Sequence, residues 1–372
     1  MLLAPDSFKG SLGSVDVCAA LATGLIAGHP DVTVRQLPMA DGGEGTVRAI
    51  ASAFTGGRME VLEAAGPLGS PVKASLLWLS GDDVAVLELA SAAGLHLVSS
   101  PDPTVTSTRG VGELMAAAMS AGARRVLVGV GGSATVDGGA GALQALGFRL
   151  LDREGASIGP GLLGLEALYS IAPPPNVPRG VELLCDVQSP LLGPRGAARQ
   201  YGPQKGADPE LVERAEVALD RFAEILTASF GRDPRTETGA GAAGGFAGGL
   251  WSACGALIRT GVHVVAELVD LEGEVAQADL VITGEGRLDE QTGEGKLVAG
   301  IQSVCARHDV PLVVVAGQIT ETGRRWCDQR GVHAFELGES THTTEERIRR
   351  APEFLERSGR QVMERLVALR DR

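Results

Sequence analysis

The sequence predicts an α/β protein with a parallel sheet built from both ends of the chain and a second α/β domain inserted between them. Apolar strand patterns alternate with helical patterns up to about residue 54, and again from about residue 262. Between these regions, short strand patterns follow one another with turn residues and no helix. The length of 372 residues agrees with about two domains at roughly 150 residues each.

The first domain is expected to comprise residues 1–60 and 261–372 and to contain five strands. Five strands alternating with helices predict a flavodoxin-like sheet with the strand order 2-1-3-4-5. In that order the loops after strands 1 and 3 are neighbours at the carboxyl edge, where ligands bind. The inserted domain, residues 61–260, would close over them and leave a cleft between the domains; two sequential domains divided near residue 180 are the alternative. The five expected strands are 2–5, 33–39, 279–283, 311–316 and 332–337.

Helix signals separate these strands. Ser14 is the expected N-cap of a helix over 15–27, and another helix follows Thr46. Near the C-terminus, Thr343 or Thr344 with Glu345 and Glu346 predicts the cap of one long helix to Leu369. The other helices expected here are 297–308 and 321–330.

The inserted region begins with a predicted meander and continues with mixed elements. The amphipathic pattern over 208–230 predicts a long helix. Residues 239–249, GAGAAGGFAGG, are interpreted either as a flexible linker or as a loop whose backbone lies against a ligand. The remaining expected strands are 59–61, 72–79, 84–89, 125–130, 148–151 and 182–185, and a helix is expected at 112–121.

Composition excludes several classes of function. Only 3% of the residues are aromatic and the net charge is −13, which argues against nucleic-acid binding. The five cysteines are scattered without a CxxC pair, which indicates a reducing compartment. No apolar run approaches 18 residues, and the chain begins directly with a strand pattern. We therefore expect a cytoplasmic protein that contacts neither nucleic acid nor membrane.

The stretch 280–296, LVITGEGRLDEQTGEGK, reads as a buried strand, a glycine loop and a helix start. Glu285, Asp289 and Glu290 supply carboxylates there, beside the cations Arg287 and Lys296. Carboxylates and cations beside backbone amides suit a metal–phosphate ligand. A charged, solvated loop is the simpler alternative, and an exposed ion pair with Glu290 would account for Arg287.

Two N-terminal turns are also candidates for ligand binding. After the first strand, Lys9 can meet a phosphate as a point charge, with the Ser7 hydroxyl beside it. After the second strand, Asp41-Gly42-Gly43 precedes a helix, which makes an amide-rich site for an anion. Asp41 could hold Mg²⁺ or accept a hydroxyl proton. An exposed lysine and a helix N-cap with a tight turn are the alternatives.

Residues 129–134, GVGGSA, fit the G-x-G-x-x-A pattern of dinucleotide-binding proteins. They follow a strand, and the next strand ends at Asp152, close to the spacing of a ribose-binding acid. An NAD(P)-dependent oxidoreductase of a small hydroxy acid is therefore the competing hypothesis. Against it, Asp137 delays the helix start and places a carboxylate where a pyrophosphate would approach.

Two further residues in the middle of the chain are candidates. Asp186 ends a strand and would point at a sheet edge, and Lys205 stands in a Gly/Pro loop, where a surface turn is the alternative. The sequence contains no Walker A motif, no G-x-S-x-G elbow and no HExxH. Hydrolysis by a catalytic triad and zinc chemistry therefore lose support.

Taken together, five blocks of the sequence resemble the bacterial type I glycerate kinase family. This resemblance implies a flavodoxin-like domain paired with an α/β domain related to the restriction-endonuclease fold. It also implies phosphorylation of D-glycerate by ATP with Mg²⁺. One departure is Ser189, where family members often carry Asn. The blocks are APDSFKGSL (4–12), PMADGGEGT (38–46), GVGGSATVDGGAGALQALG (129–147), LLGPRGAARQYGPQKGA (191–207) and LVITGEGRLDEQTGEGK (280–296).

With the resemblance in place, the candidate residues receive roles. Lys9 and Lys205 would neutralise phosphate, and Asp41 or Asp186 would be the base. Mg²⁺ is expected on Glu285 and Asp289, with Asp41 and Asp186 as further candidates. Contacts to glycerate or phosphate are expected from Ser7, Gly42, Gly43, Ser133, Asp137, Arg287 and Lys296.

The partners expected are small molecules only, D-glycerate and ATP, within organic-acid metabolism. The sequence does not distinguish O2 from O3 of glycerate as the acceptor, although 2-phosphoglycerate is favoured over 3-phosphoglycerate. A non-catalytic ligand-binding protein is a third possibility, and a homodimer is left open.

Overall fold

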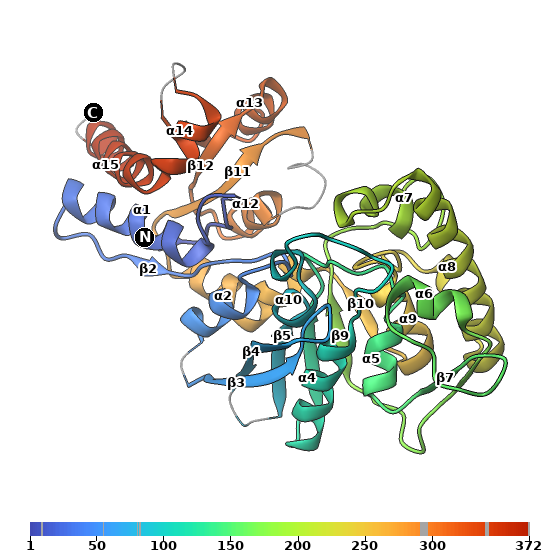
Figure 1. Cartoon of the computed structure of the whole chain (residues 1–372). Helices are drawn as coiled ribbons and strands as arrows, with labels where there is room; N and C mark the ends of the chain where they lie inside the picture. The colour runs from blue at the N-terminus through green and yellow to red at the C-terminus, as the bar shows by residue number, and fades with distance from the viewer. Residues whose placement is uncertain are drawn as a thin grey trace. The chain divides into compact units, whose positions relative to one another are not determined.

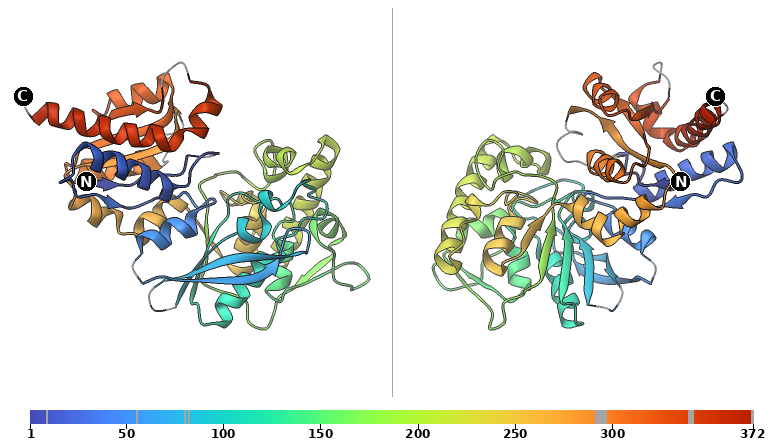
Figure 2. Two further views of the ribbon diagram at one scale, coloured as in Figure 1. Left: turned by 60° about the vertical axis from the view of Figure 1, so that its left-hand side comes forward. Right: turned by 180° about the vertical axis from the view of Figure 1, so that it is seen from behind.

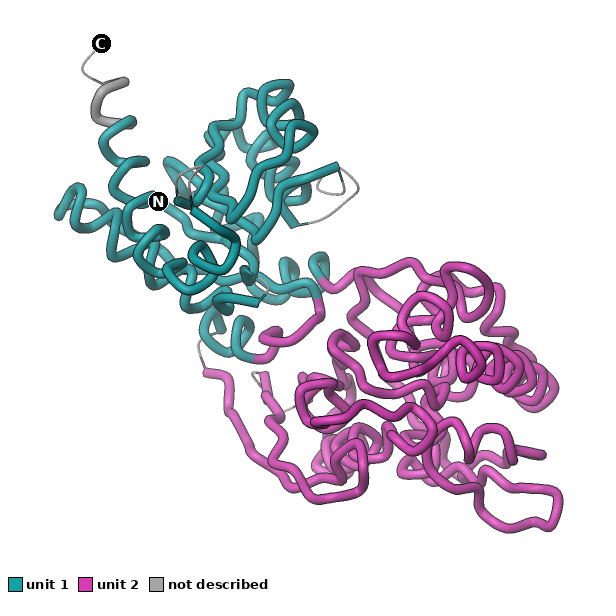
Figure 3. The backbone as a smooth tube through the Cα atoms, turned by 45° about the horizontal axis from the view of Figure 1, so that its top comes forward, with its two compact units in different colours: residues 1–41, 48–55, 262–372 teal, residues 42–47, 56–261 magenta. Residues whose placement is uncertain are grey.

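The computed structural model describes residues 1–8, 10–54, 56–79, 81, 83–290, 297–338 and 342–370, with only the backbone for 366–370. It contains a parallel five-stranded sheet and a separate mixed six-stranded sheet, which confirms the predicted α/β class with two α/β domains (Figure 1). The chain divides into two compact units (Figure 3). Unit 1 comprises Met1–Asp41, Arg48–Thr55 and Val262–Arg372, and unit 2 comprises Gly42–Val47 and Gly56–Gly261.

The sheet of unit 1 has the strand order β2-β1-β11-β12-β13, and all of its pairs are parallel. This is the predicted order 2-1-3-4-5 for strands taken from both ends of the chain. The strands are β1 (Leu2–Leu3), β2 (Arg35–Gln36), β11 (Val281–Leu288), β12 (Leu312–Ile319) and β13 (His333–Glu336).

Helices pack on both faces of this sheet. Helices α1 and α15 run side by side (Figure 2), and glycines let their backbones approach: a Cβ on Gly24 would lie 1.9 Å from the Glu356 carbonyl oxygen. The helices are α1 (Ser14–Gly28), α2 (Thr46–Ala53), α10 (Gly261–Leu268), α11 (Leu271–Ala276), α12 (Leu297–Arg307), α13 (Glu321–Asp328), α14 (Thr344–Arg349) and α15 (Ala351–Arg370).

The predicted glycine loop at 284–287 is wrong, because β11 continues through these residues to Leu288. The eight-residue strand β12 supplies a partner along this whole length, from Leu312 opposite Val281 to Ile319 opposite Leu288. These glycines do not form a turn; they allow the backbones of β11 and β12 to approach closely. A Cβ on Gly284 would lie 2.2 Å from the Val315 oxygen, and one on Gly317 would lie 2.6 Å from the Gly286 oxygen.

Two helix ends also differ from expectation. Gly13 is the N-cap of α1 and Ser14 is already helical. The long C-terminal helix is divided into α14 and α15 at Arg350, where Pro352 in the first turn of α15 lacks the N–H that a continuous helix would need. The capping box is present: Thr343 Oγ1 accepts from the Glu346 amide, and the Glu346 carboxylate accepts from the Thr343 amide.

The sheet of unit 2 has the order β10-β9-β6-β5-β4-β3. Strands β5, β6, β9 and β10 are mutually parallel, and β3, β4 and β5 form the predicted antiparallel meander. These strands are β3 (Arg58–Ala65), β4 (Pro71–Trp78), β5 (Val84–Glu88), β6 (Arg125–Gly129), β9 (Val181–Leu184) and β10 (Leu257–Arg259), while β7 (Arg149–Leu151) and β8 (Ser170–Ala172) form a separate pair.

The helices of unit 2 enclose a large apolar core. The long amphipathic helix predicted at 208–230 is present, and Asp208 is its N-cap. The α-helices are α3 (Ala90–Ala93), α4 (Arg109–Ser120), α5 (Ala140–Ala145), α6 (Gly161–Ala167), α7 (Ala197–Tyr201), α8 (Pro209–Phe230) and α9 (Phe246–Cys254), and the short 3₁₀ helices are η1 (Leu95–Leu97), η2 (Pro203–Lys205) and η3 (Pro234–Thr236).

The Gly/Ala run 239–249 is packed inside unit 2, so its interpretation as a flexible linker is wrong. Residues 240–249 are buried, and they lead directly into α9. Its glycines permit contact with neighbouring backbone, since a Cβ on Gly244 would lie 2.0 Å from the Thr135 oxygen and one on Gly249 would lie 2.0 Å from the Gly138 oxygen. The run therefore supports the 135–139 loop from inside the protein.

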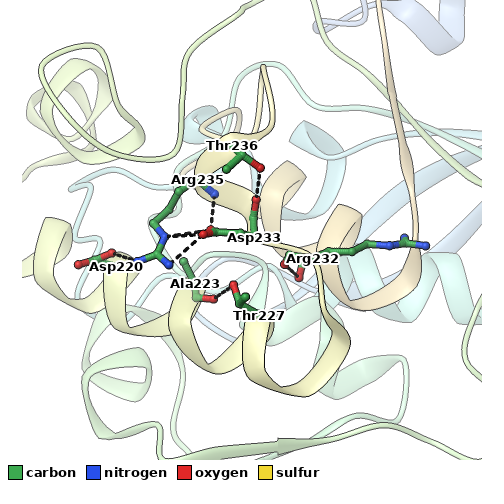
Figure 4. A network of polar contacts seen from close by, with 8 residues as sticks. Asp220, Ala223, Thr227, Arg232, Asp233, Arg235 and Thr236 are labelled. Carbon is green, nitrogen blue, oxygen red and sulfur yellow. Dashed lines mark hydrogen bonds and ion pairs between the residues drawn. The ribbon is translucent and has the colours of Figure 1, made fainter.

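A polar network ties η3 to α8 and α9 (Figure 4). The Arg235 guanidinium donates to Asp233 at 2.9 Å and to Asp220 at 2.7 Å, and it lowers the pKa of the Asp233 carboxyl. Ser252 Oγ donates to the Arg232 carbonyl at 2.6 Å. Within the described ranges, the structure contains no helix that is both long and apolar enough to cross a membrane.

Candidate active site

Unit 1 presents polar residues at the carboxyl ends of its central strands. Asp6 follows β1, and its amide donates to the Gly284 carbonyl at 2.9 Å. The Ser7 amide donates to Asp6 Oδ1 at 2.6 Å, and both side chains are half-buried. Asp41 is also half-buried and follows the segment that continues from β2. Lys9 lies outside the described residues.

The carboxylates expected to hold Mg²⁺ lie on and just after β11. Glu285 is half-buried in the strand, and Asp289 follows its end. The ion pair of Arg287 is formed with Asp289, at 3.5 Å between Nε and Oδ2, whereas the sequence suggested Glu290 as its partner. The Arg287 side chain is 61% exposed. Lys296 falls outside the part of the chain that the structure describes.

The residues of this edge suit a magnesium ion that arrives with a nucleotide. Over the described ranges, no group of three or more His, Cys, Asp or Glu side chains is close enough to form a metal cage. Mg²⁺ commonly needs only one or two protein carboxylates, because waters and substrate phosphates complete its shell. The oxygen donors of Glu285 and Asp289 fit that requirement.

Unit 2 has its own carboxyl edge, where β5, β6, β9 and β10 end side by side. The segment Gly42–Val47 packs onto this edge. A Cβ on Gly131 would lie 2.6 Å from Gly43 Cα, and a Cβ on Gly42 would lie 2.5 Å from the Leu184 oxygen. The glycines of both segments therefore permit a backbone contact that any side chain would prevent.

Lys205 lies inside unit 2 and not on a surface turn. Its side chain is 2% exposed. Nζ donates to Ser133 Oγ at 2.7 Å and to the Thr135 carbonyl at 2.8 Å, so the ammonium group binds the loop that follows β6 from within. Burial lowers the pKa of Lys205 to about 7, although the nearby Asp137 carboxylate opposes this shift.

Asp137 organises the same loop and is fully buried. Its Oδ2 accepts from the Thr108 amide and from Thr108 Oγ1, both at 2.8 Å, and from the Gly141 amide at 3.3 Å. Oδ1 accepts from the Gly139 amide at 3.0 Å. Burial nonetheless raises the pKa of the Asp137 carboxyl, because desolvation outweighs these hydrogen bonds. Asp137 therefore binds the protein's own amides and the Thr108 hydroxyl, and its contact with substrate stays a prediction.

These contacts exclude the dinucleotide-binding interpretation of residues 129–134. Helix α5 begins only at Ala140, and the Asp137 carboxylate already occupies the amides of Gly139 and Gly141. A pyrophosphate needs those amides at the helix N-terminus. Asp152, the expected ribose ligand, instead accepts from the backbone amides of Glu154 and Ala156 in its own turn.

Asp186 lies two residues after the end of β9 and is exposed. Its Oδ1 accepts from the Gly261 amide at 2.6 Å, which holds the carboxylate at the start of α10. Ser189, the departure from the family pattern, is buried and its Oγ lies 2.9 Å from the Tyr201 hydroxyl. Ser189 therefore packs against α7.

Sequence reasoning missed Glu88. This carboxylate ends β5 at the same sheet edge, and Oε1 accepts from the Val47 amide at 2.7 Å. The sequence showed only a single glutamate at the end of an apolar strand. The residue that this glutamate contacts, Val47, lies 41 positions away. A single residue pair at that separation leaves no local pattern in one sequence.

The predicted site residues thus fall into two sets, one on each unit. Asp41, Ser7, Glu285, Arg287 and Asp289 belong to unit 1. The set on unit 2 contains Gly42, Gly43, Ser133, Asp137, Asp186 and Lys205. Polar side chains and glycine amides at the carboxyl ends of parallel strands are typical of the ligand-binding edges of α/β enzymes.

Comparison with known proteins gives the particular family. The chain belongs to the glycerate kinase family, whose model matches residues 1–367, and it is a phosphotransferase of that family. It is 42% identical over 369 residues to glycerate kinase of Bacillus subtilis (strain 168), covering 97% of this chain and 96% of the relative. It is 38% identical over 371 residues to glycerate 2-kinase of Escherichia coli (strain K12), covering 97% and 96%.

A solved structure is similar over the whole length. The crystal structure described provisionally as glycerate kinase 2 from Salmonella typhimurium LT2 is 40% identical to this chain, with a TM-score of 0.86. The match covers 100% of this chain and 99% of the other. The resemblance noted in the sequence blocks is thereby confirmed at the level of the family.

Proposed function

We propose that this glycerate kinase transfers the terminal phosphoryl group of ATP to O2 of D-glycerate and releases 2-phosphoglycerate and ADP. The choice of O2 follows the relative named glycerate 2-kinase. The observation that carries the assignment on this chain is the buried ammonium group of Lys205 behind Ser133. A cation held next to a hydroxyl donor suits an anion that approaches the loop after β6.

The proposed division of labour follows the two sets of residues. Ser133 and the amides around Gly42 and Gly43 bind glycerate, while Lys205 supplies positive charge through Ser133. Asp186, exposed and fixed by the Gly261 amide, is the favoured base that accepts the hydroxyl proton, with Asp41 as the alternative. Lys9, Lys296, Ser7 and Arg287 are assigned to the phosphates of ATP or the glycerate carboxylate.

Magnesium would be held by Glu285 and Asp289. Bound there with the nucleotide, the ion would neutralise phosphate charge during transfer. Asp289 would then exchange its contact with Arg287 for the ion, since that ion pair is 3.5 Å long and its Arg287 side chain is 61% exposed. Release of Arg287 would leave its guanidinium available to a carboxylate or phosphate.

We further propose that unit 1 is a flavodoxin-like domain and that unit 2 is an inserted domain related to the restriction-endonuclease fold. The order β2-β1-β11-β12-β13 supports the first assignment. The sequence-based boundaries, 1–60 with 261–372 and 61–260, are kept as the proposed limits of two folding units.

The experiment is ADP release from ATP and Mg²⁺ in the presence of D-glycerate, with phosphorus NMR of the product. We expect release only with D-glycerate, and a phosphomonoester on the secondary carbon. 3-Hydroxypropionate, which keeps the C3 hydroxyl but lacks the proposed acceptor hydroxyl on C2, is the matched control and should release no ADP. A phosphomonoester on the primary carbon would overturn the regiochemistry, and turnover that requires NAD(P) without ATP would overturn the reaction.

A further inference from the structure

The residue of interest is Glu88, which none of the roles above includes. Its carboxylate accepts from the Val47 amide at 2.7 Å, and the Gly45 amide is close enough to help lower its pKa. Both amides belong to the segment Gly42–Val47, which lies on the carboxyl edge of the unit 2 sheet. Glu88 is thus the side chain that binds this segment from the end of β5.

The two amides are those that a substrate phosphate would use if it bound at the start of α2. A protein carboxylate holds them instead, so the start of α2 is already capped by negative charge. The rest of the turn is closed locally, since Thr46 Oγ1 donates to the Gly43 carbonyl at 2.7 Å. Gly45 has φ +95°, a conformation that favours glycine.

Glu88 is itself firmly placed. It pairs with Gly129 in the parallel register of β5 and β6, and the next amide, Leu89, donates to the Gly129 carbonyl at 2.8 Å. Ser91 Oγ donates to the Glu88 carbonyl at 2.7 Å. A Cβ on Gly129 would lie 2.7 Å from the Gly42 oxygen, so the segment rests on the same strand ends that hold Glu88.

We propose that Glu88 is a positioning residue, which fixes Gly42–Val47 on the ends of β6 and β9 in the conformation that receives glycerate. The proposal rests on the proposed function of this segment, because Gly42 and Gly43 are its substrate-binding residues. Glu88 acts through the backbone of Gly45 and Val47 and contacts no reacting atom.

The hydrogen bonds depend on the ionised carboxylate, which accepts N–H donors better than the carboxylic acid does. Burial raises the pKa of Glu88, and the Glu44 carboxylate on the same segment raises it further. The His96 side chain on η1 opposes this, and the two amides also lower the pKa. Glu88 is therefore protonated at a higher pH than an exposed glutamate, and acidification weakens the hold on the segment.

The first experiment compares Glu88→Gln with Glu113→Gln in steady-state kinetics from pH 5 to 8. Glu113 is a matched control, because it also accepts from a backbone amide of unit 2, Ala65, at 2.9 Å. We expect Glu88→Gln to raise KM for glycerate about tenfold, the loss of one charge-assisted hydrogen bond. We also expect the wild type to show a rise in KM at acid pH, Glu88→Gln to flatten that rise, and Glu113→Gln to change neither KM nor its pH dependence.

Unchanged KM and an unchanged acid limb in folded Glu88→Gln would overturn the proposal. Should that variant fail to fold, Val47→Pro removes the donor instead, since proline is tolerated in the first turn of a helix. It should reproduce the rise in KM, and a wild-type KM would equally overturn the proposal.

A second measurement does not depend on the reaction. Amide hydrogen exchange at Gly45 and Val47 should accelerate at least tenfold in Glu88→Gln, and on acidification of the wild type beyond the intrinsic pH dependence of exchange. Slow exchange in both cases would refute the role of Glu88. If the wild type released no ADP with glycerate, the proposed function would fail while this exchange result still decided the positioning role.

Discussion

Lys205 Nζ lies 2.7 Å from Ser133 Oγ, and this contact joins residues 72 positions apart in the sequence. Because an ammonium group can only donate, Ser133 Oγ must accept, and its own hydrogen is directed to another acceptor. A substrate oxygen that accepts from Ser133 would therefore interact with the lysine charge through one intervening hydroxyl. The Thr135 carbonyl, 2.8 Å from Nζ, fixes the ammonium group in this orientation.

Replacing Lys205 by methionine tests this arrangement. The side chain keeps a similar volume but loses both hydrogen bonds and the charge, so Ser133 is no longer oriented. We expect kcat/KM to fall by about 10²- to 10³-fold, the usual cost of one lost stabilising donor. Lys73→Met is the control, because Lys73 is exposed on β4 and its substitution should leave kcat/KM within about twofold. Full activity of Lys205→Met would remove the lysine from the mechanism.

The depressed pKa of Lys205 also predicts a pH dependence of stability. The ordinary pKa is 10.5 and burial lowers it to about 7, so between these values the unfolded chain binds more protons than the folded one. The free energy of unfolding should therefore increase as pH rises from about 7, by at most about 1.4 kcal/mol per pH unit. Urea unfolding at pH 7.0, 7.75 and 8.5 measures this slope, and Lys205→Met should lack it.

The buried cysteines change stability with pH in the opposite direction, and the comparison with Lys205→Met cancels their contribution, because both proteins contain them. Burial raises the pKa of Cys18 and Cys254 to about 12, and that of Cys305 and Cys327 to about 11. The unfolded thiols ionise first, as pH approaches their ordinary pKa, and these groups therefore reduce stability increasingly from about pH 8 upward. Equal slopes in the wild type and Lys205→Met between pH 7.0 and 8.5 would contradict the lowered pKa of the buried Lys205.

The sequence predicted those features of the fold that depend on residues close together in the chain. Alternating strand and helix patterns at both ends of the chain were enough for the five-strand order, and Asp208 and Thr343 marked real helix starts. Asp137 was noticed because a carboxylate interrupts a glycine pattern, and that interruption is what excludes a dinucleotide.

The remainder depended on partners far away in the sequence. Gly284–Leu288 looked like a loop by composition, but pairing with β12 makes it strand. Residues 239–249 looked flexible, but contact with the backbone of residues 135 and 138 buries them. Lys205 contacts Ser133, which is 72 positions away, and Glu88 contacts Val47, which is 41 positions away. No local sequence pattern predicts a contact between two single residues at such separations.

We expect Asp137 to contribute mainly to the free energy of unfolding. Its two oxygens accept from three amides and one hydroxyl, all buried, so an amide side chain would turn an N–H group toward N–H donors. We expect Asp137→Asn to reduce the free energy of unfolding by about 3–5 kcal/mol, as when one partner of a buried charged network is removed. Urea unfolding provides the measurement.

Asp152→Asn is the matched control for Asp137→Asn. Asp152 also accepts from two backbone amides, those of Glu154 and Ala156, but its turn is exposed to solvent. The control should change the free energy of unfolding by about 1 kcal/mol or less. Similar losses in both variants would show that burial does not set the importance of Asp137.

Gly131 should tolerate no side chain. A Cβ there would lie 2.6 Å from Gly43 Cα, which is backbone and cannot rotate away, so Gly42–Val47 would have to move off the sheet edge. We expect Gly131→Ala to raise KM for glycerate about tenfold or more and to cost about 1–3 kcal/mol of stability, as overpacking does. Steady-state kinetics and urea unfolding measure the two effects.

Gly300→Ala is the matched control for Gly131→Ala. It stands within α12, and a Cβ there would meet no atom within 4 Å. Gly300→Ala should therefore stabilise the protein by about 0.5–1 kcal/mol with no change in KM, because alanine is the better helix residue. An unchanged KM in Gly131→Ala would mean that the segment can shift without consequence for substrate.

Substitution of Asp186 tests which aspartate is the catalytic base. Asparagine keeps an oxygen that can accept from the Gly261 amide, so the structure should persist while the proton acceptor is lost. We expect Asp186→Asn to lower kcat by about 10²- to 10⁴-fold with an unchanged melting temperature. Asp186→Ala should lower kcat similarly and also cost about 1 kcal/mol, because the start of α10 loses its cap.

Asp208→Asn separates capping from catalysis. Asp208 caps α8 by accepting from the Leu211 amide at 2.8 Å, and it belongs to none of the proposed binding residues. Its substitution should leave kcat unchanged. If Asp186→Asn retained wild-type kcat, Asp186 would be only a helix cap, and Asp41→Asn should then show the loss of rate instead. Single-turnover measurements with saturating ATP and glycerate would report the chemical step in each variant, because they exclude product release.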